Sequence, residues 1–277
     1  MRNLALSPEQ YTSAMRARLG LPSEEAALLR ACTCGRLQDQ AADLWGHHLR
    51  SCDEGNALFR CHEKVVAAWA WIFQFAGFKV RSGEACGTFA HLAHCPGGDQ
   101  RCPDLVVQGW PGGTALFDAG ITCVYKTTQP PGLAPPHLRA AEAMSEAKIA
   151  HFERAKQSLL AQFPVAALVV HSCQVFPLCA DSAEGWAAKA RDVLHVCKLQ
   201  LAPERRAAAV SLWRQRLAVA LQQEGARIIR DKVAAALGSP FVGWLEAEHA
   251  WVAPLGEADL DMLPVTGAFE TGGVRNA

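Results

Sequence analysis

The sequence predicts an α/β fold in which helices flank a mixed sheet. The order of the expected core elements is helix, strand, strand, strand, helix, strand. Two of the strands are separated only by Trp110-Pro111-Gly112-Gly113, which is typical of a hairpin turn. The first core helix is apolar on most sides and ends at Gly77, so it is expected to be buried against the sheet.

The N-terminal stretch predicts two short helices within residues 5–30. Ser7 is expected to cap the first helix and Pro8 to occupy its first turn. Gly20 and Pro22 end that helix and leave room for the second. The remaining elements are expected at 57–77 (helix), 78–81, 104–110 and 115–125 (strands), 138–162 (helix), 163–171 (strand), and 183–200 and 203–237 (helices).

These elements group into four predicted regions along the chain. They are 1–56, N-terminal helices and a zinc knuckle; 57–200, the core; 201–253, a C-terminal helical extension; and 254–277, an acidic, glycine-rich tail expected to be disordered.

Composition excludes several classes of protein. Half of the 277 residues are apolar and the formal net charge is zero, so a buried core is expected and a polybasic coat is excluded. The lack of any run of about eighteen apolar residues, and of a signal-like N-terminus, predicts an intracellular protein without membrane association. The 11 cysteines are then expected to be metal ligands or buried thiols rather than disulfides.

Two acids predict the chain's chemistry. Asp104 follows Pro103 and opens one expected strand, and Asp118 lies inside the next. Neighbouring strands can bring both carboxylates to one end of the sheet, where their oxygens suit Mg²⁺ or Mn²⁺. Such an ion can bind a phosphodiester oxygen and activate a water, so the pair predicts a phosphodiesterase site; the alternative is two ordinary strand-end acids in turns.

A phosphodiesterase site of this kind also needs a cation near the phosphate. In the common arrangement a lysine follows the second acid by two residues, but this chain has Gly120 there. The nearest substitutes are Lys126 and Lys148, and Lys148 on the 138–162 helix is the preferred candidate. Glu63, on the helix before the strands, is a candidate third carboxylate, and His62 beside it could contact DNA or water.

A Cys/His segment predicts a structural zinc site. Cys32 and Cys34, followed by Cys52 and one histidine, offer the three thiolates and one imidazole of a tetrahedral site. Either His47 or His48 fits the spacing, and the alternative is a set of buried cysteines. The nearby Cys61 and His62 could interfere with this assignment. A second group could bind another metal or be a polar surface loop; its members are Cys86, His91, His94, Cys95 and Cys102.

Together these motifs resemble the endonuclease region of site-specific non-LTR retrotransposons and related reverse-transcriptase-like proteins of protists. The resembling stretches are Cys32-x-Cys34 with His47/His48 and Cys52, Arg101-Cys102-Pro103-Asp104, Asp118, and Lys148-Ile149-Ala150-His151-Phe152. The resemblance implies a restriction-endonuclease-like fold of the PD-(D/E)XK type behind a Cys-Cys-His-Cys zinc knuckle. It also implies a nuclear location, and Asp104, Asp118, Lys148 and Glu63 as catalytic residues. The chain departs from the pattern at Ala119 and Gly120, and it contains no Tyr/Phe-x-Asp-Asp motif of a reverse transcriptase.

Nucleic-acid contacts are expected from local basic residues. The 203–237 helix carries several arginines, which can lie along phosphates or pair with acids on the same helix. The residues predicted to touch DNA, or RNA, are Arg36, Arg50, Arg101, Arg214 and Arg216.

Three hypotheses follow from the sequence. The first is a metal-dependent DNA endonuclease domain detached from a reverse transcriptase. The second is a catalytically inactive nucleic-acid-binding remnant of the same fold, which the missing strand lysine favours. The third is a structural zinc protein that acts through partner proteins at its C-terminal helices.

Overall fold

The structure is a computed structural model of the chain. It describes residues 6–18, 21–24, 26–28, 34, 46–52, 57–82, 103–122, 139–162, 172–181 and 185–237. The chain divides into two compact units, Met1–Ser239 and Pro240–Ala277, and every described residue belongs to the first. The predicted tail at 254–277 lies outside the described residues.

The core of the first unit is a four-stranded mixed sheet, which confirms the predicted α/β class. Its strands are β1 (Lys79–Ser82), β2 (Leu105–Trp110), β3 (Gly113–Thr122) and β4 (Gln174–Asp181), in the order β1-β2-β3-β4. The pairs β1–β2 and β2–β3 are antiparallel, and β3–β4 is parallel.

The predicted hairpin joins β2 and β3, and three glycines allow it. Gly112 and Gly113 have φ of 96° and 119°, a region that L side chains rarely adopt. Gly109, with φ of 84°, lies where the ladder slips between Gln108 and Trp110. This bulge and turn hold β2 and β3 in the register that places the candidate site.

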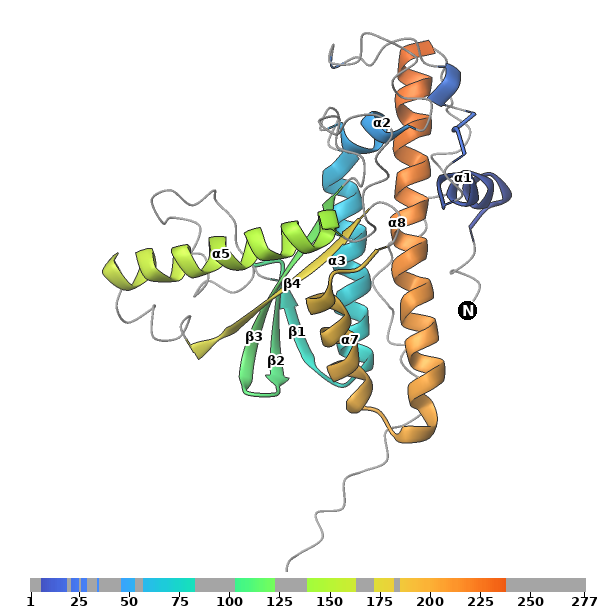
Figure 1. The fold of residues 1–277 in the computed structure, drawn as a ribbon. Helices are drawn as coiled ribbons and strands as arrows, with labels where there is room; N and C mark the ends of the chain where they lie inside the picture. The colour runs from blue at the N-terminus through green and yellow to red at the C-terminus, as the bar shows by residue number, and fades with distance from the viewer. Residues whose placement is uncertain are drawn as a thin grey trace, which may run out of the picture. The chain divides into compact units, whose positions relative to one another are not determined.

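Helices cover both faces of this sheet (Figure 1). The helix α5 (Arg139–Gln162) packs on β3 and β4, and α3 (Ala57–Phe75) packs on β1, β2 and β3. The helix α8 (Arg206–Leu237), preceded by η6 (Pro203–Arg205), packs along α3, and α7 (Ala188–Leu199) contacts β4 and α8. Three short N-terminal elements also contact α8: α1 (Pro8–Arg18), η2 (Ala26–Leu28) and α2 (His47–Ser51).

Aromatic rings fill the space between α3 and the sheet. Phe73 of α3 lies 4.5 Å from Phe117 of β3 and 6.1 Å from Trp110 of β2, measured between ring centroids. Trp69 and Trp213, both fully buried, extend this cluster toward α8. Burial of several large rings stabilises the sheet and α3 as one body, so residues on either are held rigidly.

Local signals set the helix ends. Ser7 and Gln10 form a reciprocal capping box: the Gln10 N–H donates to Ser7 Oγ (3.2 Å), and the Ser7 N–H donates to Gln10 Oε1 (2.9 Å). At the other end of the core helix, Gly77 has φ of 91° and Phe78 N–H donates to Phe73 O, as in a Schellman motif. The predicted starts and stops at Ser7 and Gly77 are therefore confirmed.

Some predicted boundaries differ from the structure. The described strand after α5 is β4 at Gln174–Asp181, whereas the strand predicted at 163–171 lies outside the described residues. The helix predicted from residue 183 begins only at Ala188, because Trp186 instead forms a β-bridge with Ala180. The second N-terminal helix is described only as the short turn η2. Among the described helices, none combines the length and apolar character needed to cross a bilayer.

Candidate functional site

The antiparallel register of β2 and β3 brings the two predicted acids together. Leu105 pairs with Phe117, so Asp104, one residue before Leu105, lies beside Asp118, one residue after Phe117. The Ala119 N–H donates to Asp104 Oδ2 at 2.6 Å, which holds the Asp104 carboxylate against β3. The convergence predicted for these acids is therefore a consequence of the hairpin.

Lys148 of α5 completes this group. Its Nζ donates to Asp118 Oδ2 at 2.5 Å, and both side chains are largely buried. The lysine predicted from the helix is thus in contact with the second acid, whereas the other candidate, Lys126, lies outside the described residues. We call Asp104, Asp118 and Lys148 the acid-pair site.

Gly120 makes the approach of Lys148 possible. Successive residues of a strand alternate between faces, so Gly120 lies on the same face of β3 as Asp118. A Cβ at Gly120 would lie 2.7 Å from Lys148 Cε and 2.6 Å from Met144 Sδ, closer than any real contact. Position 120, where the common arrangement has a lysine, therefore carries no side chain, and the side chain of Lys148 from α5 lies over it.

The carboxyl of Asp118 is perturbed by its surroundings. Burial raises the pKa of Asp118 to about 6, the cation of Lys148 opposes that rise, and the charge of Asp104 adds to it. One lysine thus does not offset the burial of Asp118 next to a second carboxylate. Carboxylate pairs of this type are the oxygen donors that hard divalent cations take in proteins.

His62 of α3, rather than Glu63, contacts the acid pair. His62 Nε2 donates to Asp104 Oδ2 at 3.1 Å, while its Nδ1 lies 3.6 Å from Glu63 Oε1. The hydrogen bond to Asp104 raises the pKa of His62, and burial opposes that rise. Glu63 is more than half exposed and reaches Asp104 only through the imidazole, so its predicted role as a third carboxylate stays a prediction.

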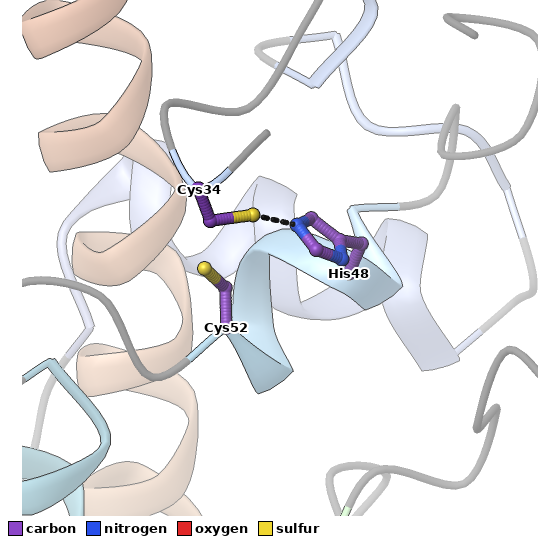
Figure 2. Close-up of side chains that lie close together, drawn as sticks. All are labelled: Cys34, His48 and Cys52. Carbon is purple, nitrogen blue, oxygen red and sulfur yellow. Dashed lines mark hydrogen bonds between the residues drawn. The ribbon is translucent and has the colours of Figure 1, made fainter. Parts of the chain in front are cut away.

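Three side chains of the predicted zinc segment form a second group. Cys34 Sγ lies 3.2 Å from His48 Nε2, and the ligand atoms of Cys34, His48 and Cys52 all lie within 4.8 Å of one another (Figure 2). Ligand atoms around a tetrahedral zinc ion are about 3.5–4 Å apart, given its bond lengths. The group is therefore the right size and chemistry to hold a metal such as zinc.

The metal-binding group is fixed against the C-terminal part of α8. Cys52 follows α2 and is buried in a small cluster with Leu49 of α2 and Ile229 of α8. Gly46, with φ of 70°, precedes α2, and a Cβ there would lie 2.9 Å from Ile229 Cδ1. The positive φ favours glycine at this point, and the approach of Ile229 adds to that preference.

The structure describes only some of the other predicted metal ligands. His48 joins the group, and nothing is described of the His47 side chain or of Cys32. Cys61 is not a member of this group of described residues, and it is buried against Ile228 of α8. The second Cys/His group, from Cys86 to Cys102, lies outside the described residues.

The predicted nucleic-acid contacts have different surroundings. Arg214 of α8 is exposed, but Arg216 is partly buried, with its guanidinium 4.3 Å from the centroid of the Trp71 ring. Arg50 is partly buried, and a Cβ added at Gly225 of α8 would lie 3.7 Å from its guanidinium. Arg36 and Arg101 lie outside the described residues.

Two acids of α8 pair with one arginine of the same helix and with one arginine of the core helix α3. Arg227 lies 3.7 Å from Glu224 and 3.6 Å from Asp231, and Arg60 of α3 lies 3.0 Å from Asp231. This end of α8 therefore fits the alternative of a helix with its own ion pairs better than a uniform phosphate-binding stripe.

Comparison with protein-family models, curated proteins and solved structures finds no match to this chain. The fold and the two side-chain groups are therefore the basis for any functional conclusion.

Proposed function

We propose that the chain is a metal-dependent DNA endonuclease domain of the restriction-endonuclease-like type. The single observation that carries the proposal is the acid-pair site, in which Asp104 and Asp118 lie side by side and Lys148 contacts one of them. Two carboxylates and an ammonium, gathered beside the paired central strands β2 and β3, are a set of groups suited to metal-assisted phosphodiester hydrolysis.

The residues fit a divalent cation by their chemistry. Both acids offer oxygen ligands, and the pKa of about 6 at Asp118 reflects a buried negative charge that Lys148 only partly offsets. Mg²⁺ or Mn²⁺ at this point would stabilise the ionised form of both acids. When bound, such a cation supplies a Lewis acid for a phosphate oxygen and a water of lowered pKa.

The protein's own residues have separate tasks in this proposal. Asp104, fixed by the Ala119 N–H and His62, would hold the cation together with Asp118. Lys148 lies beside Asp118, where its charge stabilises the extra negative charge of a pentavalent phosphate. We further propose that Cys32 completes a structural zinc site with Cys34, His48 and Cys52, and that this zinc site braces α2 on α8.

The proposal is tested by nicking of supercoiled plasmid in Mg²⁺. Asp118→Asn removes one metal-binding charge, and nicking is expected to fall by ~10²-fold or more, with the melting temperature nearly unchanged. Asp192→Asn is the matched control, because Asp192 is exposed on α7 and distant in sequence from the site. Nicking by Asp118→Asn at the rate of the control would remove Asp118 from the mechanism.

The same preparation separates the runner-up function from the first. If the parent chain retards DNA with a steep salt dependence but fails to nick it whichever divalent metal is added, the inactive binding remnant is the better description. The substitution of Gly120 for the strand lysine is the observation that favours this alternative.

A further inference from the structure

A cavity of about 530 Å³ lies between α7 and α8 and includes none of the acid-pair residues. Its volume is in the range of roughly 300–1,000 Å³ that is typical of small-molecule sites. In Figure 1, α7 runs beside the part of α8 that follows η6.

Basic side chains of both helices line this cavity. Arg191, His195 and Lys198 recur at the spacing of one face of α7, and Arg214 comes from α8. No acidic residue lines the cavity. Within the described part of the chain, none of these arginines and lysines forms an ion pair with a carboxylate.

The position of Arg191 increases the electrostatic preference for an anion. It lies near the N-terminus of α7, a helix that has no acidic residue in its first turn. The Ala188 N–H at this N-terminus already donates to Glu142 Oε1 (2.7 Å), so the helix dipole is partly offset there. Arg191 and Lys198 lie two turns apart on the cavity face of α7, and Arg214 of α8 adds a third positive charge. A bound anion lowers the repulsion among these charges, so the cavity is better matched to a negatively charged ligand than to water alone.

One side of the same cavity is lined by a tryptophan and by apolar side chains. Trp186 is half-buried, and its ring is held at 79° to the ring of Trp69, with 5.5 Å between the centroids. The backbone bridge between Trp186 and Ala180 fixes the segment that carries it. Buried Leu194 and Leu217 complete this side of the cavity. A rigid tryptophan beside several cations suits a ligand with both a phosphate and a flat ring.

We propose that the cavity between α7 and α8 binds a nucleotide, with Arg191, Lys198 and Arg214 around its phosphate and Trp186 against its base. The nucleotide is either free or one unit of a nucleic-acid strand, since both present the same chemistry. This site requires no divalent metal and no cleavage at the acid pair.

Isothermal titration of the full chain without added magnesium tests this site. The titrants are inorganic phosphate, adenosine 5′-monophosphate and a short single-stranded oligodeoxynucleotide. Binding of the mononucleotide assigns the site to free nucleotides, and binding of the oligonucleotide alone assigns it to a nucleic-acid strand. Inorganic phosphate that binds as tightly as the best nucleotide titrant would contradict the contact with the base, and no binding of any titrant would overturn the proposal.

Charge reversal locates the binding. Lys198→Glu and Arg214→Glu are each expected to weaken the affinity about tenfold or more, as loss of a charge-assisted hydrogen bond does. Lys189→Glu makes the same change on an exposed position of α7 that does not line the cavity, and it is expected to have an effect within about twofold. Equal weakening by all three variants would mean a diffuse charge effect and would overturn the site.

The two proposals fail separately. Loss of nicking in Asp118→Asn with unchanged nucleotide affinity leaves the cavity assignment intact. Loss of nucleotide affinity in Lys198→Glu with unchanged nicking leaves the acid-pair site intact.

Discussion

At the scale of single residues, the chemistry of the acid-pair site depends on how charge is balanced among four side chains. Asp104 and Asp118 are adjacent carboxyls, and Lys148 and His62 are the cations that contact them. Burial raises the pKa of Asp118 to about 6, and contact with Asp104 raises the pKa of His62. Asp118 therefore ionises just below neutral pH, where a proton and a divalent cation compete for its oxygens, and the contact with Asp104 favours the protonated form of His62.

The pH dependence of metal binding follows from these shifts. A carboxyl whose folded pKa is raised favours folding below its unfolded pKa, and that advantage is lost as pH rises through the folded value. Without metal, Asp118 therefore stabilises the fold less at about pH 7.5 than at about pH 5, and the raised pKa of His62 acts in the same direction. Metal binds the ionised acid, so the rise in melting temperature caused by Mn²⁺ should be larger at the higher pH.

Differential scanning fluorimetry with and without Mn²⁺ at the two pH values measures this difference. Asp118→Asn is the control, because it cannot ionise there and should lose the pH-dependent part of the Mn²⁺ effect. A Mn²⁺ shift that is the same at both pH values in the parent chain would contradict the assignment of the metal to Asp118.

At the scale of elements, the site is made where α5 crosses β3. The strand β3 has no side chain at Gly120, and the side chain of Lys148 from α5 occupies the space beside that position. The parallel pairing of β3 with β4 continues the sheet under α5, and Glu142 of α5 accepts a hydrogen bond from Ala188 N–H at the start of α7 (2.7 Å). The position of α5, and hence of its lysine, is fixed at both of these contacts.

Gly120→Ala tests this crossing. Its Cβ would collide with Lys148 Cε and Met144 Sδ, so the variant is expected to lose about 1–3 kcal/mol in the free energy of unfolding and to displace the amine from Asp118. Nicking should fall with it. Gly225→Ala on α8 is the matched control: its Cβ meets Arg50 only at 3.7 Å, and alanine favours a helix by about 1 kcal/mol. Chemical denaturation of both variants measures the effects, and a Gly120→Ala as stable and active as Gly225→Ala would refute the crossing.

Several elements could be predicted from the sequence, because local signals specify them. The turn at 110–113, the helix end at Gly77 and the cap at Ser7 depend on neighbouring residues alone. The strand β4 could not be predicted from such signals, because Pro177 within it argues against a strand; an edge position tolerates the missing N–H.

The two acids of the site could be predicted from the sequence, but their contacts with Lys148 and His62 could not. Asp104 and Asp118 follow from their strands, but the choice of Lys148 over Lys126 needs the packing of α5. That His62 rather than Glu63 contacts Asp104 depends on the rotation of α3, which sequence spacing leaves undetermined. The basic residues Arg191 and Lys198 of α7 belong to no predicted site, and only the cavity shows that they and Arg214 face the same space.

At the scale of the whole described unit, α8 connects the separate features. It packs along α3, which carries His62, and along α7, with which it forms the cavity. Its C-terminal part contacts the metal-binding group through Ile229 and Val233. Metal at Cys34, His48 and Cys52 should therefore stabilise the N-terminal segment on α8, remote along that helix from the cavity.

Removal of the metal-binding group tests this role. The purified chain is expected to contain about one zinc ion, and Cys52→Ser should lose it and lower the melting temperature. Cys61→Ala is the control, because it also removes a buried cysteine next to α8 but lies outside the group. Elemental analysis and calorimetry give both quantities. Zinc retained at the parent level in Cys52→Ser would contradict the assignment.

Whether the acid pair holds a divalent cation is measured by titration with Mn²⁺, in which binding removes the free-ion electron paramagnetic resonance signal. A chain already loaded with zinc should bind Mn²⁺, and Asp104→Asn combined with Asp118→Asn should abolish that binding while Asp192→Asn preserves it. Equal Mn²⁺ binding by the double variant and the parent chain would contradict the claim that these two carboxylates hold a catalytic cation.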